Sequence, residues 1–107
     1  MVNFDLPEQK LNKLGIEGIY LFGSQAQGLG GPSSDFDFGI LLEDPTILSN
    51  LEKRKKIYDE LYDIFSGQIK RLCNIDIVFL QDVYLQLQYH AVSKGKIIYQ
   101  KTPNFLA

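Results

Sequence analysis

Between Tyr20 and Glu43 the chain reads YLFGSQAQGLGGPSSDFDFGILLE, two apolar runs joined by a glycine- and serine-rich segment and an Asp-Phe-Asp triplet. The first apolar run predicts a buried strand over residues 18–22. Residues 29–34 are rich in glycine, proline and serine, which predicts a loop that turns the chain back into a second strand beginning at Asp35. The fold must therefore accommodate a strand–turn–strand unit whose polar groups gather at one end.

The turn after the first strand has the composition of an anion-binding site. Gly23 and Ser24 break the strand and open a brief helix over residues 25–28. Glycine lets an anion approach the backbone closely, and the first turn of a helix offers free N–H groups, here beside the Ser24 hydroxyl. These groups are suited to holding a phosphate.

The Asp-Phe-Asp triplet places two carboxylates on one face of the second strand. Side chains alternate along a strand, so Asp35 and Asp37 point one way while the phenylalanines at 36 and 38 point the other. Two negative charges in one small volume repel each other unless a cation lies between them, and Mg2+ prefers such oxygen ligands. The alternative is that Asp35 begins the strand and Asp37 is a solvated surface acid. The Gly-Ser turn upstream favours the metal site.

A known family carries this combination of motifs. Gly23 and Ser24, ten intervening positions and Asp35-Phe36-Asp37 resemble the signature of the polymerase-β-like nucleotidyltransferase superfamily. The chain length and the ending, a helix followed by Gly-Lys and an Ile-Ile-Tyr strand, resemble its smallest members. These are the minimal nucleotidyltransferases (MNT), which pair with HEPN-domain toxins in toxin–antitoxin operons. The resemblance covers about residues 14–101.

The resemblance implies a role for each motif position. Asp35 and Asp37 would be ligands to one or two Mg2+ ions. Gly23, Ser24 and Gln25 would hold the β- and γ-phosphates of the substrate ATP. Typical members carry arginine at one or both of the positions held here by Gln25 and Gln27, so this chain departs from the family pattern in lacking a positive contact to the triphosphate.

A third acid stands in an apolar strand further along the chain. Residues 74–80, NIDIVFL, predict a strand in which Asp76 faces away from the isoleucines that flank it. If this strand lies beside the one that begins at Asp35, Asp76 joins the two earlier carboxylates. The resemblance implies the same place for a third carboxylate, which would bind the catalytic metal and accept the proton of the attacking hydroxyl. The alternative is a surface acid at the edge of the sheet.

The remaining segments predict helices around a small sheet. In chain order they are a helix over residues 8–14 ended by Gly15, a long helix from Thr46 or Ser49 to Phe65 stopped by Ser66-Gly67, a helix over residues 83–93 and a last strand over residues 96–100. On the long helix the run Glu52-Lys53-Arg54-Lys55-Lys56 is followed by acids, which predicts a solvated face. A role in holding the triphosphate or an acidic partner is the alternative.

Composition bounds the possible functions. A chain of 107 residues with 45% hydrophobic content predicts one domain, residues 1–107, in which residues 102–107 form a flexible tail. The net charge of −2 argues against direct nucleic-acid binding, which normally needs a basic surface. A single cysteine, Cys73, a start without signal-peptide character and the lack of a membrane-length apolar run predict a cytoplasmic protein. Cys73 is predicted to be a small core residue, and the single histidine, His90, to be structural or exposed.

Together with the resemblance, these features predict an α/β (α+β) fold: a small, mixed, twisted sheet of about four strands with helices packed on one face, the palm core of the superfamily. The implied activity is an antitoxin that transfers AMP from ATP, with Mg2+, to a hydroxyl group, such as that of a tyrosine, on a partner HEPN ribonuclease toxin. Two alternatives stay open. One is a binding-only antitoxin that neutralises its HEPN partner by contact, and the other is a subunit that adenylylates a small molecule such as an aminoglycoside.

Overall fold

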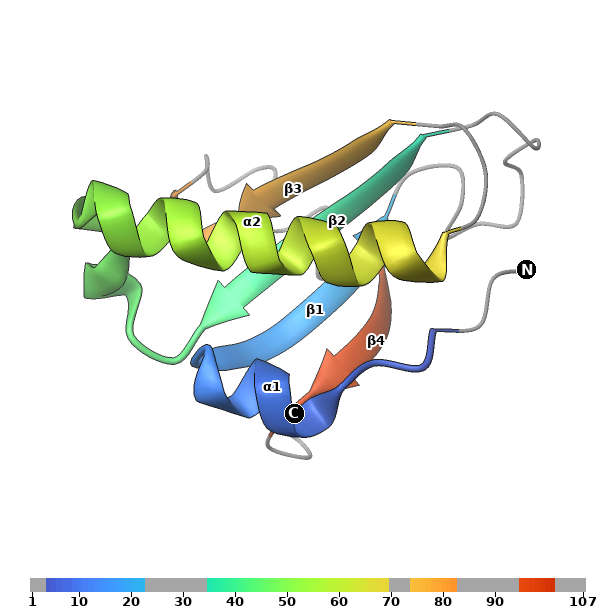
Figure 1. The fold of residues 1–107 in the computed structure, drawn as a ribbon, viewed down its shortest axis with the longest axis horizontal. Helices are drawn as coiled ribbons and strands as arrows, with labels where there is room; N and C mark the ends of the chain where they lie inside the picture. Colours follow the sequence, from blue (N-terminus) through green and yellow to red (C-terminus); the bar gives the residue numbers. More distant parts are fainter. Residues whose placement is uncertain (1–3, 23–34, 70–73, 83–94, 102–107) are drawn as a thin grey trace.

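Four strands form one mixed sheet in the computed structural model of the chain, which describes residues 4–22, 35–69, 74–82 and 95–101 (Figure 1). The elements are α1 (Glu8–Lys13), β1 (Ile16–Phe22), β2 (Phe36–Leu42), the 3-10 helix η1 (Pro45–Ser49), α2 (Leu51–Gln68), β3 (Ile75–Phe79), the 3-10 helix η2 (Leu80–Asp82) and β4 (Lys96–Gln100). The strand order is β3-β2-β1-β4, with β1 antiparallel to β2 and β4, and β2 parallel to β3. The predicted mixed four-stranded sheet is confirmed.

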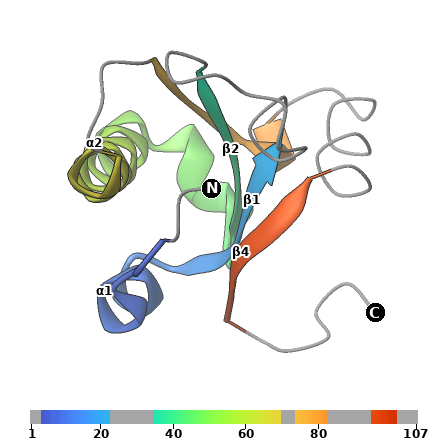
Figure 2. The same ribbon diagram turned by 90° about the vertical axis from the view of Figure 1, so that its right-hand side faces the viewer.

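Helices α1 and α2 cover the same face of the sheet, as Figure 2 shows. The buried side chains of α2, Ile57, Leu61 and Phe65, recur every four residues and so form one apolar stripe. Leu51 has the same apolar character but is 78% exposed, since it lies at the first position of the helix and outside this stripe. For the two described α-helices, this position on one face of the sheet agrees with the predicted layering.

The long helix begins and ends later than the sequence predicted. Its N-cap is Asn50, whose side chain accepts a hydrogen bond from the Lys53 N–H at 3.1 Å, so residues 45–49 form a separate 3-10 helix. Ser66-Gly67 does not stop α2, which continues to Gln68. A glycine inside a helix costs about 0.5–1 kcal/mol, and the burial of Ile69 just beyond the last turn offsets that cost.

The start of the sheet also differs slightly from the prediction. β1 begins at Ile16, two residues before the predicted strand, and Ile16 pairs with Leu42. Gly15 separates α1 from β1 with a φ of +75°, a backbone conformation that side chains disfavour, so the glycine ends this helix as predicted. The strand therefore begins directly after the turn.

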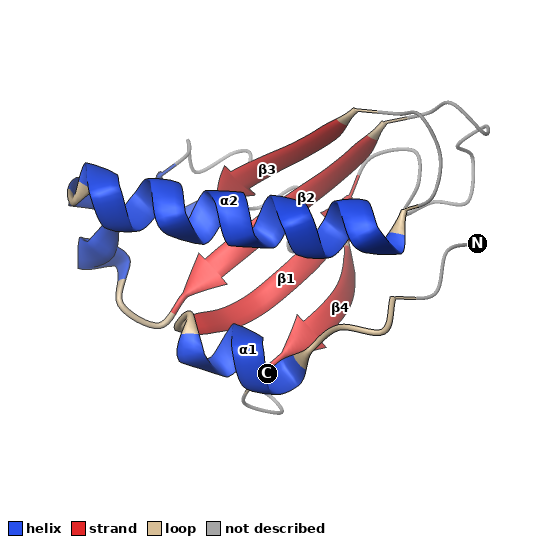
Figure 3. Ribbon diagram, in the orientation of Figure 1, coloured by secondary structure: helices blue, strands red, loops and turns tan. Residues whose placement is uncertain are grey.

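Two apolar clusters lie on opposite faces of the sheet. The larger cluster fills the space between the sheet and the two helices and includes Phe36, Phe38 and Phe65. Figure 3 shows α2 (blue) running across the strands (red) above this cluster. The smaller cluster is centred on Tyr20 and Leu80 on the other face. β2 thus alternates between the two faces and is a central strand, as its apolar sequence predicted.

The charged run of α2 is partly neutralised by acids of the chain itself. Arg54 pairs with Asp82 at 2.7 Å and lies over the ring of Phe79, and Lys55 pairs with Asp59 one turn along the helix. These pairs are solvent-accessible, in agreement with the predicted solvated face. No helix in the described part of the chain combines the length and the apolar character needed to cross a membrane.

Several predicted features lie outside the described residues. They are the phosphate-binding turn with Gly23, Ser24, Gln25 and Gln27, the helix over residues 25–28, the loop over residues 29–34, Cys73, the helix over residues 83–93 with His90, and the tail over residues 102–107.

The close approach of Leu80 to β2 gives a test of the packing. A Cβ atom added at Gly39 would lie 3.0–3.1 Å from three carbons of the Leu80 side chain, so Leu80 occupies the space that a side chain would need. We expect Gly39→Ala to lower the free energy of unfolding by about 1–3 kcal/mol through overpacking. In urea unfolding, Gly39→Ala combined with Leu80→Ala should cost less than the sum of the two single changes. Additive costs would contradict this contact.

Candidate active site

Parallel pairing of β2 with β3 brings two acids side by side. Asp37 and Asp76 are paired across the two strands, and on its other side Asp37 is paired with Phe22 of β1. Directly paired residues of neighbouring strands project from the same face of the sheet. The structure therefore forms a row of Phe22, Asp37 and Asp76 across three strands.

This row lies on the face of the sheet opposite α1 and α2. Phe36 and Phe38 are buried in the large cluster beneath α2, so the alternation along β2 directs Asp37 to the other face. Asp37 is partly buried, whereas Asp76 is exposed. The described helices leave this face open at the position of the acids.

The neighbouring carboxyl group of Asp76 opposes ionisation of Asp37. Burial raises the pKa of Asp37 above the ordinary carboxyl range; the charge of Asp76, a side-chain hydrogen bond between the two carboxyl groups, and the charge of Asp35 raise it further. A hydrogen bond between two carboxyl groups requires a proton on one of them. A divalent cation between the oxygens would replace that proton and remove the repulsion.

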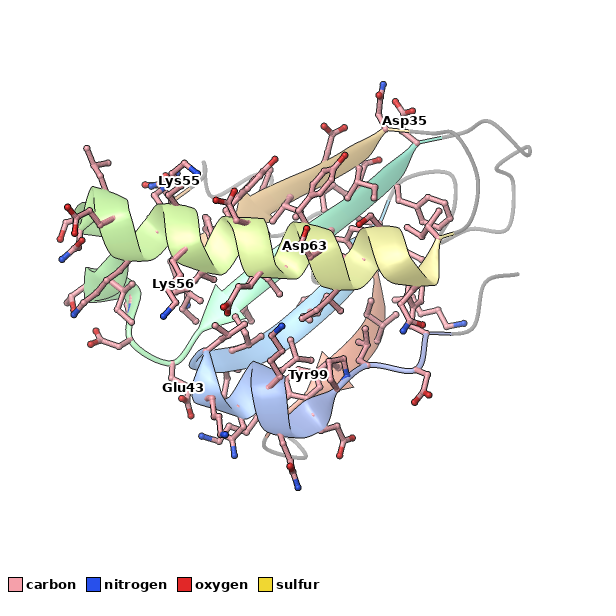
Figure 4. All side chains as sticks on the ribbon, in the orientation of Figure 1. Asp35, Glu43, Lys55, Lys56, Asp63 and Tyr99 are labelled. Carbon is pink, nitrogen blue, oxygen red and sulfur yellow. The ribbon has the colours of Figure 1, made fainter. Side chains whose placement is uncertain are left out.

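Asp35 stands at the edge of this pair. It is exposed, just before β2 begins, and its Oδ1 accepts a hydrogen bond from the backbone N–H of Asn74 at 3.3 Å (Figure 4). The Asn74 carbonyl in turn accepts from the N–H of Phe36 at 3.0 Å. Asp35 thereby links the starts of the two parallel strands.

The donor set fits a hard cation, but only two of its members are close together. Asp37 and Asp76 supply the oxygen ligands that Mg2+ prefers. Within residues 4–22, 35–69, 74–82 and 95–101, no group of three or more His, Cys, Asp or Glu side chains is close enough to hold a metal ion. The structure thus unites Asp37 with Asp76, and the three-carboxylate centre that includes Asp35 stays a prediction.

Two contributors to the site were not predicted. Phe22 pairs with Asp37 and is also the residue directly before Gly23, so the predicted phosphate-binding turn starts one residue away from the acid row. Asn74 fixes Asp35 through its backbone. The position of Phe22 next to the Gly-Ser pair was a usable signal, whereas a backbone contact leaves no trace in the sequence.

The raised pKa of Asp37 predicts how stability depends on pH. The folded chain holds this proton more tightly than the unfolded chain, so the free energy of unfolding falls as pH rises from the ordinary carboxyl range through the raised pKa. Asp37→Asn removes that loss. In metal-free urea unfolding from pH 4 to pH 8, we expect this variant to gain stability over the wild type with rising pH.

Asp63→Asn is the matched control for this comparison, because Asp63 is an exposed acid of α2, the helix that covers the opposite face (Figure 4). If the stability difference between Asp37→Asn and wild type does not change with pH, the assigned repulsion between Asp37 and Asp76 is wrong.

The chain matches one protein-family model and several solved structures. The family model described as polymerase beta, nucleotidyltransferase matches residues 8–104. No curated protein gives a significant match. Among solved structures, a toxin–antitoxin complex with AMP-PNP is similar, with 27% identity and a TM-score of 0.53 over 91% of this chain and 76% of that chain.

Two further similar structures are variants of the toxin–antitoxin pair MntA–HpeT. One has 26% identity and a TM-score of 0.54 over 92% of this chain and 76% of that chain. The other has 24% identity and a TM-score of 0.55 over 91% of this chain and 75% of that chain, and it shows the fold alone.

Proposed function

This chain belongs to the polymerase beta nucleotidyltransferase family, and on that premise we propose that it transfers AMP from ATP, with Mg2+, to a hydroxyl group of a partner protein. The observation that carries the proposal is the pairing of Asp37 with Asp76 on the face of the sheet opposite α1 and α2. Repulsion between the two carboxylates lowers the stability of the fold. Cation binding accounts for the presence of this pair despite its cost in stability.

In the proposed reaction, Asp37 and Asp76 hold the metal and Asp35 is available at the edge of the pair. Bound Mg2+ would neutralise the triphosphate and lower the pKa of the attacking hydroxyl. The hydroxyl oxygen forms a bond to the α-phosphorus, and the bond from that phosphorus to the bridging oxygen breaks to release pyrophosphate. Asp76, the more exposed acid of the pair, accepts the hydroxyl proton.

The predicted phosphate-binding turn completes the site. Ser24 and the backbone N–H groups around Gly23 and Gln25 would hold the phosphates that leave. Support comes from the chain order, because Phe22 ends β1 beside Asp37 and the turn follows immediately. The similar complex that contains AMP-PNP, an ATP analogue, supports ATP as the donor.

The partner that we propose is a HEPN-domain toxin. The resemblance to minimal nucleotidyltransferases implies this partner, and the similar structures are toxin–antitoxin complexes. Modification of a tyrosine hydroxyl of the toxin would neutralise it. The described part of the chain forms a single sheet with its helices, so we assign recognition of the acceptor to the surface of the partner.

A binding-only antitoxin is the second candidate, and one observation favours it. The described residues bring only two of the three predicted acids together. A contact-only antitoxin would neutralise its partner without ATP, whereas the enzyme requires ATP and a divalent cation.

Transfer of label separates the two candidates. The purified chain is incubated with α-labelled ATP, Mg2+ and the product of the neighbouring gene, which is tested as the HEPN-domain partner. Label on that protein is measured over time. We expect Asp37→Asn to reduce the rate at least about 100-fold, because the metal loses a ligand at the reacting centre. Asp63→Asn, the same change on the opposite face, should retain the wild-type rate.

Partner neutralisation without any label on the partner would contradict the enzyme and support the contact-only antitoxin. Equal rates for wild type and Asp37→Asn would contradict the role given to the acid pair.

A further inference from the structure

Residues 4–7, here called the strap, lie on the helix-covered side of the sheet, where the first of them, Phe4, contacts the face of β2 opposite the acids. The strap precedes α1 and lies near the end of α2 (Figure 1). No role for these residues was predicted. Its contacts combine aromatic packing by Phe4 with hydrogen bonds between Asp5 and Gln68.

The ring of Phe4 contacts the two phenylalanines that alternate with the acids. Phe4 meets Phe36 edge-on at 6.3 Å between ring centroids and Phe38 edge-on at 5.7 Å, each with an interplanar angle of 85°. These T-shaped arrangements are the favoured geometry of aromatic pairs, each worth about 0.5–1.5 kcal/mol beyond burial. The Phe4 ring therefore contacts both sequence neighbours of Asp37 on the buried face of β2.

A second aromatic ring holds the same segment from α2. Phe65 stacks on Phe38 with 3.8 Å between ring centroids and an interplanar angle of 5°, and Phe36 stacks on Phe38 at 6.1 Å. The strand between Phe36 and Phe38 is thus held on its buried face by rings from two other parts of the chain. Asp37 projects from the opposite face of this held segment.

A side-chain amide fixes the strap itself. The Asp5 N–H donates to Oε1 of Gln68 at 2.9 Å, and Nε2 of Gln68 donates to the Asp5 carbonyl at 2.9 Å. The Gln68 amide therefore pairs with the strap backbone as a neighbouring strand would, at the last residue of α2. These two hydrogen bonds hold the backbone of the residue directly after Phe4.

We propose that Phe4 and Gln68 are positioning residues that hold Asp37 at the correct distance from Asp76. The need is electrostatic, because two carboxylates at directly paired positions repel each other and so oppose the pairing of β2 with β3 at this point. Displacement of a catalytic group by 1 Å can cost about 100-fold in rate. The inference rests on the proposed function, because the acids matter as metal ligands.

The experiment compares strap variants with a packing control. Phe4→Ala and Gln68→Ala remove the two strap contacts one at a time. Ile47→Ala is the matched control, since Ile47 is also a partly buried side chain on the same core but follows β2 at the end away from Asp37. Urea unfolding measures the stability that each variant loses.

Two readouts then report on the acids. Calorimetry measures the affinity for Mn2+ in the presence of AMP-PNP, and the label-transfer assay measures kcat and the KM for ATP. For Phe4→Ala and Gln68→Ala we expect metal affinity and kcat to fall about tenfold, with the KM for ATP changed less than about twofold. Phe4→Tyr keeps the ring and should restore most of both values.

Ile47→Ala should lose stability while keeping wild-type metal affinity and kcat. The proposal is overturned if Ile47→Ala loses as much metal affinity and kcat as Phe4→Ala at a similar loss of stability, or if neither strap variant changes them. A wild-type chain that binds Mn2+ without transferring label contradicts the proposed function, and the affinity comparison then decides the role of the strap. A chain that does neither contradicts both.

Discussion

The placement of Asp37 beside Asp76 by the parallel pairing of β2 and β3 is the constraint on which the rest of the structure depends. Two carboxyl groups at paired positions repel each other, so this part of the sheet must be held together by contacts elsewhere. The fold supplies them on the opposite face, where Phe36 and Phe38 anchor β2 in the large apolar cluster. The proposed metal-binding side chains and the stabilising apolar side chains therefore lie on the two opposite faces of one strand.

Because the acids and the large apolar cluster lie on opposite faces of β2, a small chain can carry two carboxyl groups that repel each other. Burial of large apolar side chains under α2 supplies most of the favourable free energy, at about 25 cal/mol per Å2 of apolar surface. The acids add repulsion in the absence of a cation. Metal binding would remove the repulsion, so the free energy that destabilises the empty site becomes part of the affinity for the metal.

Features that depend on neighbouring residues could be predicted from the sequence, whereas the pairing of residues on different strands could not. The Asp-Phe-Asp alternation predicted which side chains share a face, and the acid in NIDIVFL indicated that Asp76 would join them only if its strand lay beside β2. The alternation could not tell whether Asp35 or Asp37 would pair with Asp76, because register is set by the partner strand. Asp37 proved to be the paired acid, and Asp35 instead accepts a hydrogen bond from the backbone of Asn74.

Contacts across long sequence separations were also beyond prediction. Asp5 and Gln68 are 63 positions apart, and their hydrogen bonds use backbone atoms of the strap that every residue possesses. The predicted end of α2 was wrong. Ser66-Gly67 commonly ends a helix, but here α2 continues to Gln68 and the burial of Ile69 offsets the low helix propensity of glycine. Most of the functional prediction came from the resemblance to the family signature. The pairing of β2 with β3 now shows that two of the three predicted acids, Asp37 and Asp76, lie side by side.

The most direct test of a shared site at Asp37 and Asp76 is a double-mutant cycle on metal binding. Calorimetry would measure Mn2+ affinity with AMP-PNP for wild type, Asp37→Asn, Asp76→Asn and the double variant. If the two acids hold one ion together, each single change should abolish most of the affinity and the double variant should be little worse than either. Independent, additive losses, or unchanged affinity in either single variant, would contradict a shared metal site.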